Sequence, residues 1–249
     1  MLIQILKWLG VALGAVVIVL LLYLLFLGVC VLFVDKSRNY DKPSRFYRAL
    51  ANSLDSLILF FCHVRVHLEG SEKLPKDTLY LLVGNHISGY DPLITMWALR
   101  KENLIFVSKP ENWNIPIAGR LAVRCCFRSI DRENARSALL TIQDCARLIK
   151  ENAGPVAIYP EGTRSKTGEL LPFHNGVFKI AQEAKVPIAI MSVSGSDFIR
   201  KNAPWRRSDV TLRILDVLPA EQVCTERTSA IGNTVRGILL GEKDSENGN

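Results

Sequence analysis

The chain has 249 residues, a net charge of +7 and 49% hydrophobic residues. This length suits one catalytic domain with an appendage rather than two large domains. The hydrophobic content excludes a disordered chain, and 16 Gly and 11 Pro exclude collagen-like and low-complexity classes. The sequence contains no basic helix interleaved with aromatic residues and no zinc-finger or RNA-binding motif, so nucleic acid is not expected as a partner.

The N-terminal segment is strongly apolar, and residues 8–34 contain no charged side chain. As a helix this stretch reaches roughly 40 Å, more than the ~30 Å hydrocarbon core of a bilayer. A cleaved signal peptide is the alternative, but its apolar stretch usually runs only about 7–15 residues. We therefore expect residues 1–34 to form a retained membrane anchor with a single transmembrane helix.

The charges around this segment predict its orientation. Only Lys7 and the amino terminus precede it, whereas five basic residues follow: Lys36, Arg38, Lys42, Arg45 and Arg48. Because positive charge accumulates on the cytoplasmic side, the rest of the chain is expected at the cytoplasmic face, near anionic lipid headgroups. The six cysteines form no Cys-x-x-Cys pair, so we expect reduced thiols and no structural metal.

Residues 35–62 are expected to form a basic joint followed by an amphipathic helix over residues 45–62. Apolar residues recur there at helical spacing, and the other face carries Arg48, Asn52, Asp55 and Ser56. The helix could belong to the core of the following domain. We prefer an interfacial helix lying on the bilayer, because the membrane anchor adjoins it.

From residue 63 the sequence alternates between short apolar runs and helical stretches. Strands are predicted at residues 64–68, 79–84, 104–108, 125–130, 155–159, 187–193 and 210–218, and helices at 92–100, 133–152, 176–185 and 220–240. Cys125 and Cys126 fall in a predicted strand. This alternation predicts an α/β domain over residues 63–240, a single domain whose mostly buried mixed sheet is flanked by helices. Residues 241–249 are expected to be a disordered tail.

The first polar loop follows the predicted strand 79–84 and contains Asn85, His86 and Asp91. Histidine can accept a proton from a hydroxyl near neutral pH. A carboxylate on its other ring nitrogen fixes the tautomer and stabilises the imidazolium. Asp91 could instead cap the helix that begins with Pro92, and taken alone these residues are structural about as often as catalytic.

A second polar loop, residues 159–165, follows the predicted strand 155–159. Gly162 lets the backbone approach a ligand closely, Thr163 supplies a hydroxyl, and Arg164 can contact two phosphate oxygens. An ordinary turn with a solvated arginine is the alternative. Lys109 and Arg132 follow two further predicted strands. Four polar strand ends indicate a shared anionic pocket beside a histidine base, and hence transfer onto the hydroxyl of a phosphorylated substrate.

At these residues the sequence resembles the 1-acylglycerol-3-phosphate acyltransferase family of the glycerolipid acyltransferase superfamily, over about residues 60–218. Residues 85–91 are similar to its NHxxxxD block, residues 127–132 to its second block, 161–165 to EGTRS and 173–176 to FxxG. Ile87 stands where Gln is common in the family. Residues 186–191 lack the second Pro that usually closes the fourth block.

The resemblance implies an acyltransferase that converts lysophosphatidate to phosphatidate. His86 would take the proton of the sn-2 hydroxyl, which attacks an acyl thioester of coenzyme A or acyl carrier protein, and Asp91 would orient the imidazole. The resemblance places these residues in substrate binding: Asn85, Lys109, Arg132, Glu161, Gly162, Thr163 and Arg164. No metal or other cofactor is expected.

Three alternatives remain from the sequence. The acceptor could be another lysolipid or glycerol 3-phosphate. The protein could also be a membrane-anchored lipid hydrolase, although no Gly-x-Ser-x-Gly motif is present. A non-catalytic lipid-binding module would not need both His86 and Asp91.

Overall fold

The computed structural model describes residues 1–247 and contains a seven-stranded sheet in the order β1-β7-β6-β2-β5-β3-β4. The strands are β1 (Val64–Glu69), β2 (Leu81–Gly84), β3 (Ile105–Ser108), β4 (Arg128–Ser129), β5 (Val156–Ile158), β6 (Ile188–Ser194) and β7 (Ser208–Leu218). Neighbouring strands are parallel except for β6 and β7, which are antiparallel. The predicted α/β class with a mixed sheet is confirmed.

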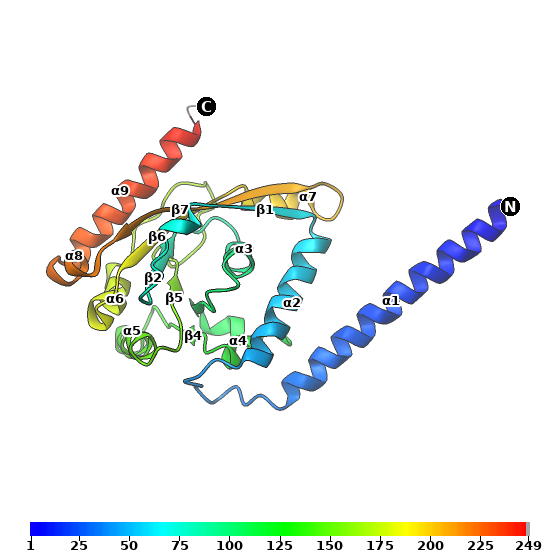
Figure 1. Cartoon of the computed structure of the whole chain (residues 1–249), viewed down its shortest axis with the longest axis horizontal. Helices are drawn as coiled ribbons and strands as arrows, with labels where there is room; N and C mark the ends of the chain where they lie inside the picture. Colours follow the sequence, from blue (N-terminus) through cyan, green and yellow to red (C-terminus); the bar gives the residue numbers. More distant parts are fainter. Residues whose placement is uncertain (248–249) are drawn as a thin grey trace.

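Helices cover both faces of the sheet (Figure 1). They are α1 (Leu2–Leu32), α2 (Arg45–Phe61), α3 (Asp91–Ala98), α4 (Ala118–Arg124), α5 (Ala135–Lys150), α6 (Lys179–Ala184), α7 (Ile199–Asn202), α8 (Ala220–Thr225) and α9 (Thr228–Asn247). Helices α5, α6, α8 and α9 contribute to the hydrophobic cluster on one face, and α2, α3 and α7 contribute to the cluster on the other. Because side chains alternate along a strand, Leu81 and Val83 of β2 enter the first cluster and Leu82 the second. The central strands are therefore buried on both faces.

The predicted strand over residues 125–130 is shorter than expected. Only Arg128–Ser129 pair with β3, whereas Cys125 caps α4 and Cys126 has a φ of 64°. The prediction that both cysteines lie in a strand is therefore wrong. The reason is the preceding helix α4, which the sequence pattern did not reveal and whose last turn includes the backbone of Cys125.

Helix α1 projects away from the domain in Figure 1 and is long and apolar enough to cross a membrane. Its C-terminal end is docked: Leu27 and Val31 are buried against α2 and α4. The last carbonyls of a helix lack intrahelical donors. Here the Arg120 guanidinium donates to three carbonyls at the end of α1, the shortest bond being 2.9 Å to the oxygen of Val31. The direction of α1 is thus coupled to the domain.

Helix α2 belongs to the domain and contacts α3, α4 and β1. Arg48 and Asp55 of the predicted polar face are only 5% and 1% exposed, whereas the apolar side chains of Phe46 and Phe60 are 53% and 70% exposed. The helix therefore turns part of its polar face toward the domain and leaves some of its apolar side chains exposed. Packing against α3, α4 and β1 buries Arg48 and Asp55. Nη2 of Arg48 donates to the carbonyl oxygens of Asn103 and Cys125, whereas its Nε has no hydrogen-bond partner among the described residues.

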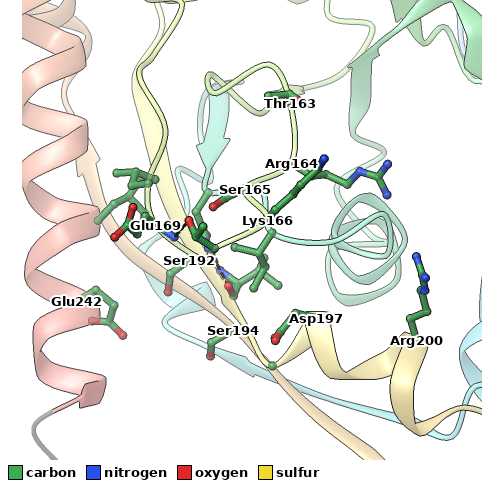
Figure 2. A pocket seen from close by; sticks show the side chains of 18 residues that line it. Thr163, Arg164, Ser165, Lys166, Glu169, Ser192, Ser194, Asp197, Arg200 and Glu242 are labelled. Atoms are coloured by element: carbon green, nitrogen blue, oxygen red, sulfur yellow. Dashed lines mark hydrogen bonds between the residues drawn. The ribbon is translucent and has the colours of Figure 1, made fainter.

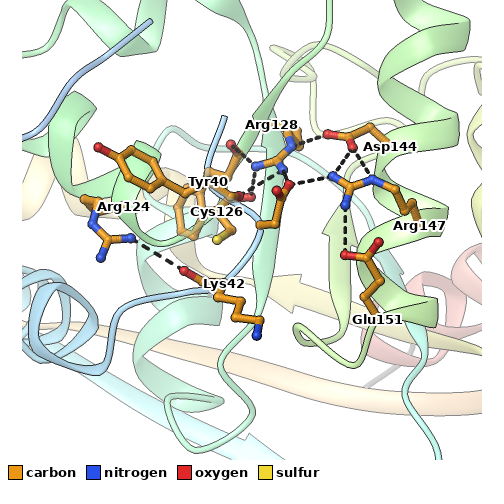
Figure 3. Close-up of polar contacts among 10 residues, drawn as sticks. Tyr40, Lys42, Arg124, Cys126, Arg128, Asp144, Arg147 and Glu151 are labelled. Atoms are coloured by element: carbon orange, nitrogen blue, oxygen red, sulfur yellow. Dashed lines mark hydrogen bonds and ion pairs between the residues drawn. The ribbon is translucent and has the colours of Figure 1, made fainter. Parts of the chain in front are cut away.

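A polar network holds the joint between α1 and α2 against the sheet (Figure 3). The buried Arg128 side chain donates to the carbonyl of Tyr40 at 3.0 Å and to Asp144 at 2.5 Å. Arg147 of α5 bridges Asp144 and Asp41, both at 2.6 Å. These contacts fix the start of α2 relative to β4 and α5.

The C-terminal region differs from the prediction of one helix over residues 220–240 and a disordered tail over 241–249. Two helices are present, and α9 continues through Asn247. An ion pair between Arg213 of β7 and Glu242 attaches this extension to the sheet. Residues 248–249 of the predicted tail lie outside the described residues.

Candidate active site

The candidate residues come together because four neighbouring strands, β2, β5, β3 and β4, run parallel. The carboxyl ends of parallel strands meet at one edge of a sheet, where open α/β folds bind ligands. His86 follows β2, Lys109 follows β3, Arg132 follows β4, and β5 leads into the loop with Arg164. Residues from well-separated parts of the chain thus share one edge.

The central feature is a hydrogen bond of 2.8 Å between Nδ1 of His86 and Oδ2 of Asp91. The Asp91 side chain is fully buried, and that of His86 is 16% exposed. Oδ2 of Asp91 also accepts the backbone N–H groups of Ile87 and Ser88, both at 2.8 Å. Its other oxygen accepts the hydroxyl of Ser196. Asp91 accepts hydrogen bonds from these backbone and hydroxyl donors, which suits a carboxylate that orients the imidazole.

The hydrogen bonds of the Asp91 side chain show that this residue does not cap α3. Asp91 is the first residue of α3 and is followed by Pro92, but no side-chain cap hydrogen bond is present at this helix start. The carboxylate instead turns back to the loop that precedes it. Its partners are therefore His86 and the loop backbone.

Tyr159 fixes the other side of the imidazole. Its ring stacks on His86 with centroids 4.5 Å apart and an interplanar angle of 20°. Its hydroxyl lies 3.0 Å from that of Thr95, and complete burial raises the pKa of the Tyr159 phenol well above its usual value. The stacked ring restricts rotation of His86. Sequence reasoning missed this role, although Tyr159 stands directly before the EGTRS motif.

His86 lies in the wall of a cavity of about 610 Å³. Five predicted binding residues also line it: Lys109, Arg132, Gly162, Thr163 and Arg164. The remaining wall is largely apolar and comes mainly from α2, α3, α4 and the strand ends, with Leu54, Ile58, Leu93, Met96, Phe106 and Leu121 among its residues. One cavity thus combines a histidine base, three cations and an apolar surface.

Two other predicted binding residues brace the site. Asn85 joins β2 to β6 because its amide oxygen accepts the N–H of Val193 at 2.8 Å and its amide nitrogen donates to the Val193 carbonyl at 2.9 Å. Glu161 is 2% exposed and accepts the N–H groups of His86 and Leu171 at 2.6 and 2.8 Å. Burial raises the pKa of Glu161, while these two hydrogen bonds oppose the rise. Asn85 and Glu161 therefore position neighbouring backbone segments of the site and do not offer their polar atoms to a ligand.

Gly162 allows two basic side chains to approach the loop. Its φ is +72°, and a Cβ atom there would lie 2.8 Å from Cδ2 of His174 and 3.3 Å from Nε of Arg132. Both side chains line the cavity. Burial lowers the pKa of Arg132, and Glu111 opposes that shift. The sequence assigns His174 no role beyond its place in the segment similar to FxxG, and only the structure shows that it lies near Arg132 in the cavity wall.

Arg164 lies between this cavity and a neighbouring one of about 790 Å³ (Figure 2). In the figure, Arg164 and Arg200 lie on one side of the second cavity, and Glu169 and Glu242 on the other. Arg164 is exposed and makes no hydrogen bond or ion pair with the side chains that the structure describes, those of residues 1–242. Its guanidinium is therefore available to an anion that enters from solvent.

This site and fold define an α/β protein with a histidine–aspartate pair beside a cationic, partly apolar cavity. The family model described as Acyltransferase matches residues 65–194. This match spans more than half of the chain, and the chain belongs to the acyltransferase family.

Curated relatives include 1-acyl-sn-glycerol-3-phosphate acyltransferases. The protein from Cocos nucifera is 34% identical over 148 residues, which cover 59% of this chain and 46% of the relative. The alpha enzyme from Homo sapiens is 27% identical over 188 residues, covering 74% and 65% respectively. The chain spans about half the length of the first of these relatives.

A solved structure shares the fold. The 1-acyl-sn-glycerophosphate acyltransferase PlsC from Thermotoga maritima superposes with a TM-score of 0.63 and 21% identity, over 79% of each chain. At this identity the comparison establishes the fold.

Proposed function

We propose that this protein transfers a fatty acyl group from a thioester to the sn-2 hydroxyl of lysophosphatidate, forming phosphatidate. The observation that carries the proposal is the His86–Asp91 pair in a cavity that also holds Lys109, Arg132 and Arg164. Histidine suits deprotonation of a hydroxyl, and arginine suits a phosphate monoester. The activity named for the relatives supports the same reaction.

The proposed reaction uses the two nitrogens of His86 differently. Asp91 engages Nδ1, so Nε2 accepts the hydroxyl proton as the acceptor oxygen attacks the thioester carbonyl. The new C–O bond forms a tetrahedral oxyanion, and its collapse breaks the C–S bond. The imidazolium returns the proton to the departing thiolate, while Asp91 stabilises the imidazolium. The thioester, carried by coenzyme A or acyl carrier protein, is the only co-substrate.

The three cationic side chains would have two roles in this reaction, binding of the phosphate and stabilisation of the oxyanion. Arg132 and Arg164 suit the acceptor phosphate, because a guanidinium can donate to two phosphate oxygens at once. Lys109 lines the same cavity, and its side chain makes no hydrogen bond or ion pair with the described side chains of residues 1–242. Its ammonium or nearby backbone N–H groups would stabilise the oxyanion.

We further propose that α1 crosses a membrane and holds the domain at its cytoplasmic face. The apolar length of α1 supports this, as does the excess of basic residues after it. Phe46 and Phe60 of α2 are exposed and suit contact with lipid. The joint's basic residues would then meet anionic headgroups.

The test is acyl transfer by the purified full-length protein in lipid micelles. Lysophosphatidate, other lysolipids and glycerol 3-phosphate would each be offered with acyl-coenzyme A or acyl carrier protein thioesters, and the products identified by mass spectrometry. The proposal expects phosphatidate from lysophosphatidate and none with the His86→Ala variant. Product from another acceptor alone would overturn the assigned acceptor, and release of free fatty acid alone would indicate a hydrolase. Binding without any product would indicate a lipid-binding module.

A further inference from the structure

Asp55 is an unusual group in the wall of the cavity that holds His86. It lies on α2 among apolar lining residues that include Leu54 and Ile58, and it is 1% exposed. Neither of its carboxyl oxygens has a hydrogen-bond partner among the described residues. Buried polar groups are nearly always hydrogen-bonded, so an unpartnered carboxyl group in a ligand cavity calls for an explanation.

Asp55 forms no ion pair with the basic side chains that the structure describes, and burial is the one influence on its pKa. The nearest basic residue along the same helix is Arg48, whose guanidinium donates to the carbonyl oxygens of Asn103 and Cys125. Burial alone raises the pKa of Asp55, to about 8. The group is therefore mainly protonated at neutral pH and presents one O–H donor together with acceptor oxygens.

We infer that Asp55 is a specificity determinant that forms hydrogen bonds with a hydroxyl group carried on the acyl chain of the donor. This inference rests on the proposed function, which places an acyl chain in the apolar cavity beside His86. A hydroxyl is neutral, so it enters such a cavity without the cost of desolvating a charge. It also both donates and accepts, which matches a protonated carboxyl group. A plain acyl chain leaves Asp55 without a partner.

The experiment measures donor choice by the full-length protein in micelles with lysophosphatidate as acceptor. A plain hexadecanoyl thioester competes with hexadecanoyl thioesters that carry one hydroxyl at successive positions. We expect the wild type to favour at least one hydroxylated donor by about five- to tenfold in kcat/KM, the range of one or two net hydrogen bonds. Asp55→Leu should abolish that preference, whereas Asp55→Asn should retain most of it because an amide still donates and accepts.

Ser56→Ala is the matched control. Ser56 is the next residue of α2, is exposed, and bonds only to the carbonyl of Asn52, so its loss should leave the donor ratio unchanged. A general defect in folding would lower turnover of both donors without changing their ratio.

Two results would overturn the inference about Asp55 while leaving the proposed function intact. The wild type could use the plain donor and favour no hydroxylated one, or Asp55→Leu could keep the wild-type ratio. Either would mean that water or local repacking satisfies the carboxyl group. Absence of product from every donor, plain and hydroxylated, would instead overturn the proposed function, and the inference with it.

Discussion

The hydroxyl of Ser196 donates to Oδ1 of Asp91, although the two residues lie 105 positions apart in the chain. Ser196 follows β6 and is fully buried, so this bond ties the carboxylate to a second strand end. His86 occupies the other oxygen. The orientation of the pair is thus determined from both sides of the carboxylate.

Ser196→Ala tests this relationship. Loss of one hydrogen bond of ordinary net strength should lower kcat by about three- to tenfold with little change in either KM. Ser194→Ala is the control, because Ser194 is only partly buried, ends β6 and makes no side-chain hydrogen bond with the described residues. An unchanged kcat in Ser196→Ala would show that the backbone donors suffice to orient Asp91.

His86→Ala should remove the proposed base and lower kcat by at least about 10²–10⁴-fold while the fold is retained. Asp91→Asn should also be severe, because an amide in the place of the carboxylate favours the wrong imidazole tautomer. Steady-state rates and circular dichroism would be compared for the two variants. A near-normal rate in His86→Ala would exclude the mechanism.

Arg164→Ala should weaken acceptor binding more than donor binding if the guanidinium holds the phosphate. Loss of a charge-assisted contact of ~1.5–3 kcal/mol corresponds to roughly a 10- to 150-fold higher KM for lysophosphatidate, with a smaller change in kcat. Arg164→Lys should recover only part of the loss, because an ammonium lacks the planar fork.

The control for this change is Lys166→Ala, since Lys166 is exposed and lines only the neighbouring cavity. The measurement is KM for acceptor and donor separately in all variants. Equal effects on both substrates would assign Arg164 a structural role.

Asp55 should make stability depend on pH. Burial raises its pKa to about 8 in the folded protein, against about 3.9 in an unfolded chain. Between these values the unfolded chain releases the proton that the folded chain keeps, so stability contributed by the neutral group is full below pH ~4 and falls as pH rises toward 8. The stability of the Asp55→Asn variant should not show this fall with rising pH, because an amide does not ionise.

The measurement is chemical unfolding of both proteins in detergent over that pH range. The advantage of Asp55→Asn should grow with pH to at most about 5 kcal/mol, the limit set by a shift of about four units. A difference between the two proteins that stays constant with pH would show that Asp55 ionises normally.

Deletion of residues 2–26 should weaken membrane association while leaving the docked end of α1 in place. That end includes Leu27 and Val31, whose removal would expose apolar surface of α2 and α4. Sedimentation with vesicles would compare the truncated and full-length proteins. Full retention of binding would mean that α1 is not the main anchor, whereas weak residual binding fits the exposed aromatic residues of α2.

The order and position of nearly all strands follow from the sequence, because alternation of side chains and the residues that end a strand are local properties. For the same reason, the placement of His86, Lys109, Arg132 and the loop at residues 159–165 directly after predicted strands is visible without a structure. Their convergence is then expected from parallel pairing, and the structure brings their side chains to one edge.

The positions and hydrogen bonds of side chains whose partners are distant in the sequence could be learned only from the tertiary structure. The inward position of Asp55 follows from packing of α2 against α3 and α4, which no periodicity within α2 reveals. The bond from Ser196 to Asp91 needs the end of β6 beside the loop after β2. Asn85 and Glu161 look like ligand contacts in the sequence, but their polar atoms are occupied by backbone groups of other strands and loops. Sequence pattern thus determined which residues stand at the strand ends, and three-dimensional packing determined which of them face the cavity and which support those that do.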